Sequence, residues 1–131
     1  MEVLSCKVYL CSMKKTVVLG ASPNPDRYSY EATLRLRAAH HVVIPIGMRG
    51  GKIDGVDIIT DRPLIDAVDT VTLYIGPQNQ HEWESYILAL KPRRVIFNPG
   101  TVNTELIDTL NKAGIETEVA CTLVLLSLNA Y

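Results

Sequence analysis

Short apolar runs alternate along the chain with segments of helix-forming composition. The apolar runs are rich in β-branched residues and most end at Gly, Pro or Asn, which is typical of a buried strand followed by a turn. The pattern predicts five strands, at residues 16–19, 41–46, 70–75, 94–97 and 115–119. It predicts helices around residues 28–39, 83–90, 104–113 and 121–129, and one short helical turn at residues 61–67.

The second of these helices has the clearest periodicity. Its single apolar face, at helical spacing, is formed by Trp83, Tyr86, Ile87 and Leu90. Residues 28–39 are ambiguous, because their apolar positions also alternate with a period of two. Their helix-forming composition favours a helix.

Capping residues define the third helix. Asn103 is a good N-cap, and Val102 and Ile107 have the spacing of a hydrophobic staple. Gly114 supplies the C-terminal stop. The side chains expected to face inward are those of Leu106, Ile107, Leu110 and Ala113.

The alternation of strands and helices predicts an α/β protein. We expect a Rossmann-like, doubly wound sheet of about five parallel strands in three layers, with helices on both faces. Ligands of such sheets bind outside the carboxyl ends of the strands, where the strand order reverses. Gly and Pro follow four of the predicted strands and are ordinary in such turns, so only the first loop favours a functional interpretation by itself.

Length and composition narrow the choice of partners. A chain of 131 residues with 47% hydrophobic and 21% charged residues suits one globular domain. The formal net charge is −1 and the basic residues are scattered, which argues against a nucleic-acid partner. The longest apolar stretch, residues 119–128, is too short to span a membrane. Three cysteines without a CxxC spacing favour a reducing, cytoplasmic setting.

The first twelve residues differ from the rest. They lack a basic start and a long apolar core, so they make a poor secretory signal. Our hypothesis is that residues 1–12 are an N-terminal extension and that the domain covers residues 13–131, with Met13 as the biological start. The alternating pattern of residues 3–10 would suit an added edge strand, including one between chains. The intact mass of the protein made from its native gene tests this hypothesis.

The loop after the first predicted strand suits a phosphate group. Gly20 permits a tight turn, and Pro23 and Pro25 stiffen the loop. The loop opens a helix, whose first amide groups have no partner inside the helix and whose dipole is positive at this end. Further donors and one charge are available from Ser22, Asn24, Ser29 and Arg27.

The second strand indicates which phosphate compound fits. The dinucleotide fingerprint G-x-G-x-x-G is absent, and no acid follows the strand to bind ribose hydroxyls as in NAD sites. Instead Arg49 and Lys52 flank Gly50 and Gly51. A basic pair at this place favours an extra phosphate near the ribose, as in NADP or coenzyme A.

These segments together resemble the family of small stand-alone CoA-binding domains, which is similar in fold to the CoA-binding domain of the succinyl-CoA synthetase α subunit. The resemblance runs from about residue 15 to residue 121, through GASPNPDRYSY, VIPIGMRGGKIDG, LYIGP, FNPGTVN and a late cysteine. The family's phosphate loop maps onto Gly20, Ala21, Ser22, Pro23 and Asn24, with Arg27, Ser29 and Tyr30. Its second-strand motif maps onto Ile44, Pro45 and Ile46, followed by Gly47 and the basic Arg49. Its third and fourth strand ends map onto Tyr74, Ile75, Gly76 and Pro77, and onto Asn98 and Gly100.

The chain also departs from that family. Many members carry Asn-Pro where this chain has Gly47-Met48, and Lys where it has Arg49. Arg still supplies the charge. The third strand of most members ends in a more polar segment than residues 73–75.

The residues support binding better than catalysis. His81-Glu82 begins like a zincin motif, but Ser85 stands in place of the second histidine. Cys121 could lie near a CoA thiol, although a buried structural cysteine is the commoner role. We see no nucleophile–base pair and no metal site, and we therefore predict no catalytic residue.

Three functions are consistent with these features. The first is non-catalytic binding of coenzyme A or an acyl-CoA, with a regulatory use. The alternatives are an NADP-binding oxidoreductase and a detached CoA-binding subunit of an acyl-CoA ligase. The expected partner is the small-molecule CoA ligand, with neither nucleic acid nor membrane; a homodimer or a complex with a ligase-type protein is left open.

Overall fold

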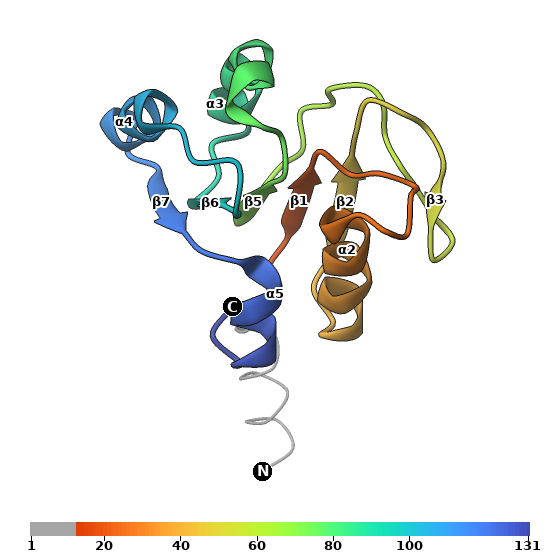
Figure 1. The fold of residues 1–131 in the computed structure, drawn as a ribbon. Coiled ribbons are helices and arrows are strands. Elements are labelled where there is room, and N and C mark those ends of the chain that lie inside the picture. Colours follow the sequence, from red (N-terminus) through yellow and green to blue (C-terminus); the bar gives the residue numbers. More distant parts are fainter. Residues whose placement is uncertain (1–12) are drawn as a thin grey trace.

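Buried β-branched residues form a five-stranded parallel sheet in the computed structural model, which describes residues 13–131 (Figure 1). Within that range the strand order in the sheet is β2-β1-β5-β6-β7. The strands are β1 (Thr16–Leu19), β2 (Val43–Ile46), β5 (Thr70–Leu73), β6 (Arg94–Phe97) and β7 (Glu116–Val119). They pair in register along their full lengths, so their carboxyl ends meet at one edge.

Helices cover both faces of this sheet, and the predicted three-layer α/β architecture is confirmed. The helices are α2 (Tyr28–Ala38), α3 (Glu84–Leu90), α4 (Thr104–Lys112) and α5 (Thr122–Ser127). Side chains alternate along β1: Val17 and Leu19 pack with the core of α3 and α4, whereas Val18 packs with Leu36 of α2. Leu126 of α5 joins the core on the α2 side, and α2 and α5 lie side by side in Figure 1.

The ambiguous segment after the first strand is a helix. Its buried residues are Ser29, Ala32, Thr33 and Leu36, which recur at helical spacing and form one stripe toward the sheet. The period-two alternation in its sequence therefore has no structural counterpart.

The structure differs from the sequence prediction in three details. Residues 61–67 form no helix: Ala67 adopts φ +57°, which interrupts a helix, and the Pro63 carbonyl accepts a hydrogen bond of 2.6 Å from the Tyr86 hydroxyl. The loop after β2 contains a small hairpin, β3 (Lys52–Ile53) and β4 (Val56–Asp57). Ala113 is exposed at the end of α4 rather than inward-facing.

The remaining elements agree with the pattern. The Asn103 side chain caps α4 by accepting a hydrogen bond of 3.2 Å from the Leu106 amide, and Gly114 follows with φ +83°. Two 3-10 turns, η1 (Pro77–Asn79) and η2 (His81–Trp83), precede α3. The expected extension and edge strand at residues 1–12 lie outside the described residues. Across residues 13–131, no helix combines the length and apolar character needed to cross a bilayer.

The strand order creates a crevice between β1 and β5. The chain passes from β1 to β2 on one side of β1, and then crosses back to β5 on the other side. The loop after β1 leads to α2 on one face, whereas the loop after β5 leads to α3 on the opposite face. The two loops therefore diverge, which is the arrangement that binds ligands in doubly wound sheets.

Trp83 provides a test of the α3 side of the core. It is 2% exposed, its ring meets that of Tyr86 edge-on at 6.1 Å, and the Arg62 guanidinium lies 3.9 Å from the ring centre. Replacing Trp83 with Ala should lower the free energy of unfolding by roughly 3–5 kcal/mol, as for other buried aromatic truncations. Urea denaturation followed by circular dichroism measures the change. Tyr28→Ala, at a residue 74% exposed, is the control and should stay within about 0.5 kcal/mol; a loss below about 1 kcal/mol for Trp83→Ala would contradict this packing.

Candidate functional site

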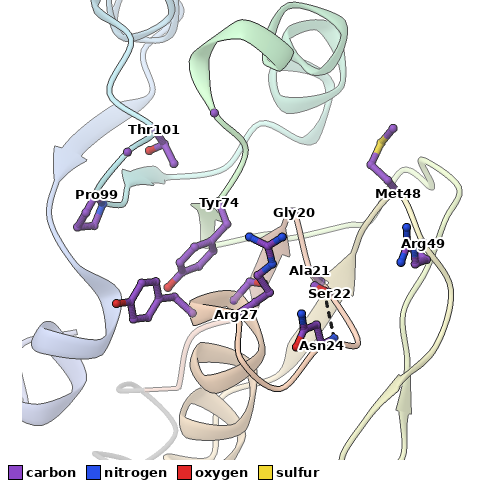
Figure 2. Close-up of a pocket in the computed structure, with 14 residues that line it drawn as sticks. Gly20, Ala21, Ser22, Asn24, Arg27, Met48, Arg49, Tyr74, Pro99 and Thr101 are labelled. Carbon is purple, nitrogen blue, oxygen red and sulfur yellow. Dashed lines mark hydrogen bonds between the residues drawn. The ribbon is translucent and has the colours of Figure 1, made fainter.

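A cleft of about 450 Å³ opens at the carboxyl ends of the strands. Its walls are the loops after β1, β2, β5 and β6 and the first turn of α2 (Figure 2). The lining residues are Gly20, Ala21, Ser22, Asn24, Arg27, Tyr28, Ser29, Met48, Arg49, Tyr74, Gly76, Pro99, Gly100 and Thr101. The sequence prediction placed a site at this edge, and four separate segments of the chain meet there.

Close backbone packing holds the loop after β1 in place. The amides of Gly20 and Ala21 both donate to the Ile46 carbonyl, each at 2.9 Å. A Cβ at Gly47 would lie 2.1 Å from the Ala21 carbonyl oxygen, so only glycine fits there. Gly20 adopts φ +98°, and a Cβ there would lie 3.0 Å from Tyr74 backbone. The loop is thus fixed against both neighbouring strands.

The loop also uses its own side chains to keep its shape. The Ser22 hydroxyl oxygen accepts a hydrogen bond of 3.1 Å from the Asn24 amide, and Asn24 Oδ1 accepts one of 3.0 Å from the Asp26 amide. These bonds use only the oxygen atoms as acceptors, so the Ser22 hydroxyl proton and the Asn24 side-chain NH2 group remain available as donors to a ligand. Arg27 stands at the N-cap of α2 without a side-chain capping bond. The helix therefore presents its positive end to the cleft.

Two arginines give the cleft a positive charge. Arg27 and Arg49 line it from different loops, both are exposed, and neither forms an ion pair within the described chain (Figure 2). The 14 lining residues include no carboxylate. Lys52, which the sequence paired with Arg49, instead bonds Asp57 at 2.8 Å in the β3–β4 hairpin and does not line the cleft. Of the predicted basic pair, Arg49 lines the cleft and Lys52 does not.

Tyr74 forms part of the wall between the first and third loops. Its ring packs with the α2 side of the core, and its hydroxyl is buried without a hydrogen-bond partner among the described residues. Burial raises the pKa of Tyr74 from 10.0 to about 12. This hydroxyl is therefore protonated at neutral pH.

Asn98 lies beneath the cleft and does not line it. It is 1% exposed, and its Nδ2 donates to Thr72 Oγ1 at 2.7 Å and to the Leu73 carbonyl at 2.9 Å. Its Oδ1 accepts a hydrogen bond of 2.9 Å from the Thr122 amide. The side-chain amide thus ties β6 to β5 and to the start of α5, which gives Asn98 a structural role beneath the cleft.

Other residues named from the sequence also lie outside the lining. Ile46 is fully buried in the core on the α3 side, and Tyr30 packs with the core on the α2 side. Pro23 lies against Gly51, since a Cβ added at Gly51 would lie 2.7 Å from the Pro23 side chain. The complete set outside the lining is Pro23, Tyr30, Ile44, Pro45, Ile46, Gly47, Ile75, Pro77 and Asn98.

The sequence site set omitted four residues of the lining. They are Tyr28, Met48, Pro99 and Thr101, each next to a residue in that set. Tyr28 and Met48 are 74% and 75% exposed, so their apolar side chains are available at the rim of the cleft. The signal available in the sequence was only their position, because each stands next to a residue of the predicted site set.

Cys121, which the sequence raised as a candidate, and His41 lie outside the lining of the cleft. Cys121 is half-buried at the N-cap of α5 and is not among the lining residues. His41 Nδ1 accepts a hydrogen bond of 2.9 Å from the Lys14 amide, and burial followed by the charge of Lys14 lowers its pKa. Within residues 13–131, no three His, Cys, Asp or Glu residues are placed to hold a metal ion.

Comparisons with known proteins point to a family. A family model described as a CoA binding domain matches residues 14–127. The crystal structure of an uncharacterized protein is 54% identical, covering 91% of this chain and 98% of its own, with a TM-score of 0.89. A protein from Thermus thermophilus is 25% identical over the whole of both chains, with a TM-score of 0.80. A hypothetical protein from Pyrococcus horikoshii OT3 shares the fold at 23% identity, covering 90% of this chain and 84% of its own, with a TM-score of 0.77. Among curated proteins, no match to the chain is significant.

Because the folded protein buries the neutral Tyr74 hydroxyl, we predict that its free energy of unfolding falls at alkaline pH. Because its pKa in the folded protein is raised to about 12, the stabilisation is present below pH 10 and is lost as the pH rises from about 10 through about 12. Tyr74→Phe should flatten this decline, and at pH 7 it should change stability by less than about 1 kcal/mol, since the hydroxyl forms no hydrogen bond to any of residues 13–131. Urea denaturation between pH 7 and 11 measures both effects; a decline of equal slope in the variant would contradict this placement of the hydroxyl.

Proposed function

This chain belongs to the CoA binding domain family, and we propose that its strand-end cleft binds coenzyme A or an acyl-CoA without catalysing a reaction. One observation carries the proposal: a rigid loop and the start of α2 lie between two unpaired arginines in a cleft without carboxylates. Such a site favours a ligand with several phosphates. Coenzyme A carries a diphosphate and a ribose phosphate, and so matches this charge.

The two arginines would bind different phosphates. Arg27 stands at the start of α2, beside the amide groups that suit the diphosphate. Arg49 follows β2, on the side where doubly wound folds place the ribose of a bound nucleotide. We therefore assign Arg49 to the ribose phosphate, which separates coenzyme A from NAD.

The exposed apolar side chains at the rim would contact the adenine ring. Tyr28 begins α2 and Met48 follows β2, and both line the cleft with their side chains mostly in solvent. An aromatic ring and a polarizable thioether both suit the flat face of a base. Their exposure would then fall on binding.

The absence of catalysis rests on the character of the lining. Tyr74 is the lining group with a resolved pKa shift, and its pKa of about 12 is far from neutral pH. Among residues 13–131, the cleft is lined by no histidine and no carboxylate. Regulation by a CoA or acyl-CoA level is the use that fits such a binding module, and a cytoplasmic setting fits the cysteine pattern.

Two alternatives use the same cleft. An NADP-binding oxidoreductase is favoured by Arg49 after β2, but the loop GASPNP lacks the dinucleotide fingerprint. Hydride transfer with a nicotinamide cofactor would reveal it. A detached subunit of an acyl-CoA ligase would bind coenzyme A in the same way and take its chemistry from a partner protein, and a ligase domain encoded beside this chain would favour it.

Arg49→Glu provides the test, with Lys52→Glu as a matched control. A charge-assisted contact to phosphate is worth roughly 1.5–3 kcal/mol, so Arg49→Glu should weaken coenzyme A by more than about tenfold. Lys52→Glu changes the net charge equally but lies outside the cleft, paired with Asp57, and should change affinity by less than about threefold in physiological salt. Titration calorimetry measures both; equal effects of the two substitutions would contradict the assignment of Arg49.

A second set of ligands tests the place of the ribose phosphate. Dephospho-CoA, which lacks that phosphate, should bind the native protein more weakly than coenzyme A, because it loses the charge contact with Arg49. The two ligands should bind Arg49→Ala about equally. NAD should bind weakly throughout, because no acid follows β2. If NAD bound as tightly as coenzyme A, the proposed ligand would be wrong.

A further inference from the structure

Gln80 is a buried polar residue outside the cleft lining. It lies between η1 and η2 and is 1% exposed. A buried side-chain amide is unfavourable unless hydrogen bonds satisfy its donors and its acceptor. Those bonds show which parts of the structure depend on Gln80.

The Gln80 amide bridges two loops that are far apart in sequence. Its Nε2 donates to the Ile75 carbonyl at 2.8 Å and to the Thr101 carbonyl at 2.7 Å. Its Oε1 accepts a hydrogen bond of 3.0 Å from Asn103 Nδ2, and Asn103 in turn caps α4 through the Leu106 amide. One side chain thus joins the end of β5, the loop after β6 and the start of α4.

Both bridged loops are walls of the cleft. Ile75 immediately precedes Gly76, and Thr101 is itself a lining residue. Figure 2 shows Pro99 and Thr101 on one side of the cleft, and Met48 and Arg49 on the other. Arg49 therefore lies away from the wall that Gln80 holds, and Arg27 lies between the two sides.

This division of charge indicates which part of the ligand meets that wall. Coenzyme A has its phosphates on the nucleotide half, and the pantetheine arm is uncharged. The side that carries Arg49 suits the nucleotide half, with Arg27 at the centre, whereas Gly76, Pro99, Gly100 and Thr101 carry no charge. The uncharged arm would then run along the wall that Gln80 holds.

We propose that Gln80 is a positioning residue, which sets the spacing between the loops after β5 and β6 and thereby the affinity for the uncharged arm of the ligand. This inference rests on the proposed function. Gln80 does not line the cleft, so it would act through its bonds to the Ile75 and Thr101 carbonyls. Gln80→Leu, of similar size, removes both donors and leaves these carbonyls free to turn toward water, which separates the loops.

The experiment compares two ligands across matched variants. Coenzyme A has both halves, whereas adenosine 3′,5′-bisphosphate has only the nucleotide half. Gln80→Leu should raise the Kd for coenzyme A by about tenfold and leave that for the bisphosphate within about twofold. Two control variants, Ile87→Val and Leu110→Ala, lie at fully buried positions of the core on the α3 side. Their smaller and larger losses of stability should enclose that of Gln80→Leu, and neither variant should change either Kd by more than about twofold.

Amide hydrogen exchange gives a readout that needs no ligand. Exchange in residues 75–77 and 99–102 should be faster in Gln80→Leu than in either core variant, because the bridge between these loops is lost. Unchanged exchange together with unchanged affinity for coenzyme A would overturn the inference about Gln80. An equal loss for both ligands would also overturn it, because the effect would then not be selective for the arm. A native protein that binds neither ligand would contradict the proposed function, and with it the affinity role of Gln80.

Discussion

The cleft depends on a backbone contact between the loops after β1 and β2. The Ala21 carbonyl lies so close to Gly47 that no side chain can stand there. In the same loop, the amides of Gly20 and Ala21 donate hydrogen bonds to the Ile46 carbonyl. This contact fixes where the first loop ends and where α2 begins, so it also fixes the positions of Arg27 and the first helical amides. A larger residue at position 47 would displace the whole positive side of the cleft.

Two buried side-chain amides hold the loops after β5 and β6 in place, as the contact at Gly47 holds the loops after β1 and β2. Asn98 joins β6, β5 and the start of α5, and Gln80 joins the loops after β5 and β6. Backbone groups are left without ladder partners where strands end, and these two side chains satisfy some of them. The walls of the cleft are thus held before any ligand arrives. Such preorganisation lowers the ordering cost of binding a long ligand.

The fold could be predicted because local patterns and global architecture agree. Strands ended by Gly, Pro or Asn and the single apolar face of α3 gave the correct layers. The β3–β4 hairpin was not predicted, because its strands have two residues each and give no periodic signal. The short helical turn predicted at residues 61–67 is absent, because a contact with Tyr86 and the left-handed Ala67 hold this segment in another conformation.

The site was harder to predict than the fold for a physical reason. A polar residue at a strand end can face a ligand or bind its own chain, and sequence alone does not separate the two. Asn98 was inferred to contact the ligand, yet its partner at position 122 is 24 residues away in sequence. Gln80 gave no signal for the same reason, since its partner Thr101 is 21 residues away. Arg49 and Lys52 are close in sequence, but only the structure shows that Lys52 pairs with Asp57 while Arg49 lines the cleft.

A titration of the ¹⁵N-labelled protein with coenzyme A, followed by NMR, tests the central claim most directly. The amide signals of residues 20–30, 48–50, 74–76 and 99–101 should shift together and saturate at one affinity. Signals at the opposite end of the sheet, around Lys14 and His41, should stay unchanged. Shifts confined to that opposite end, or no shift at any concentration of coenzyme A, would contradict the proposal that this cleft is a CoA site.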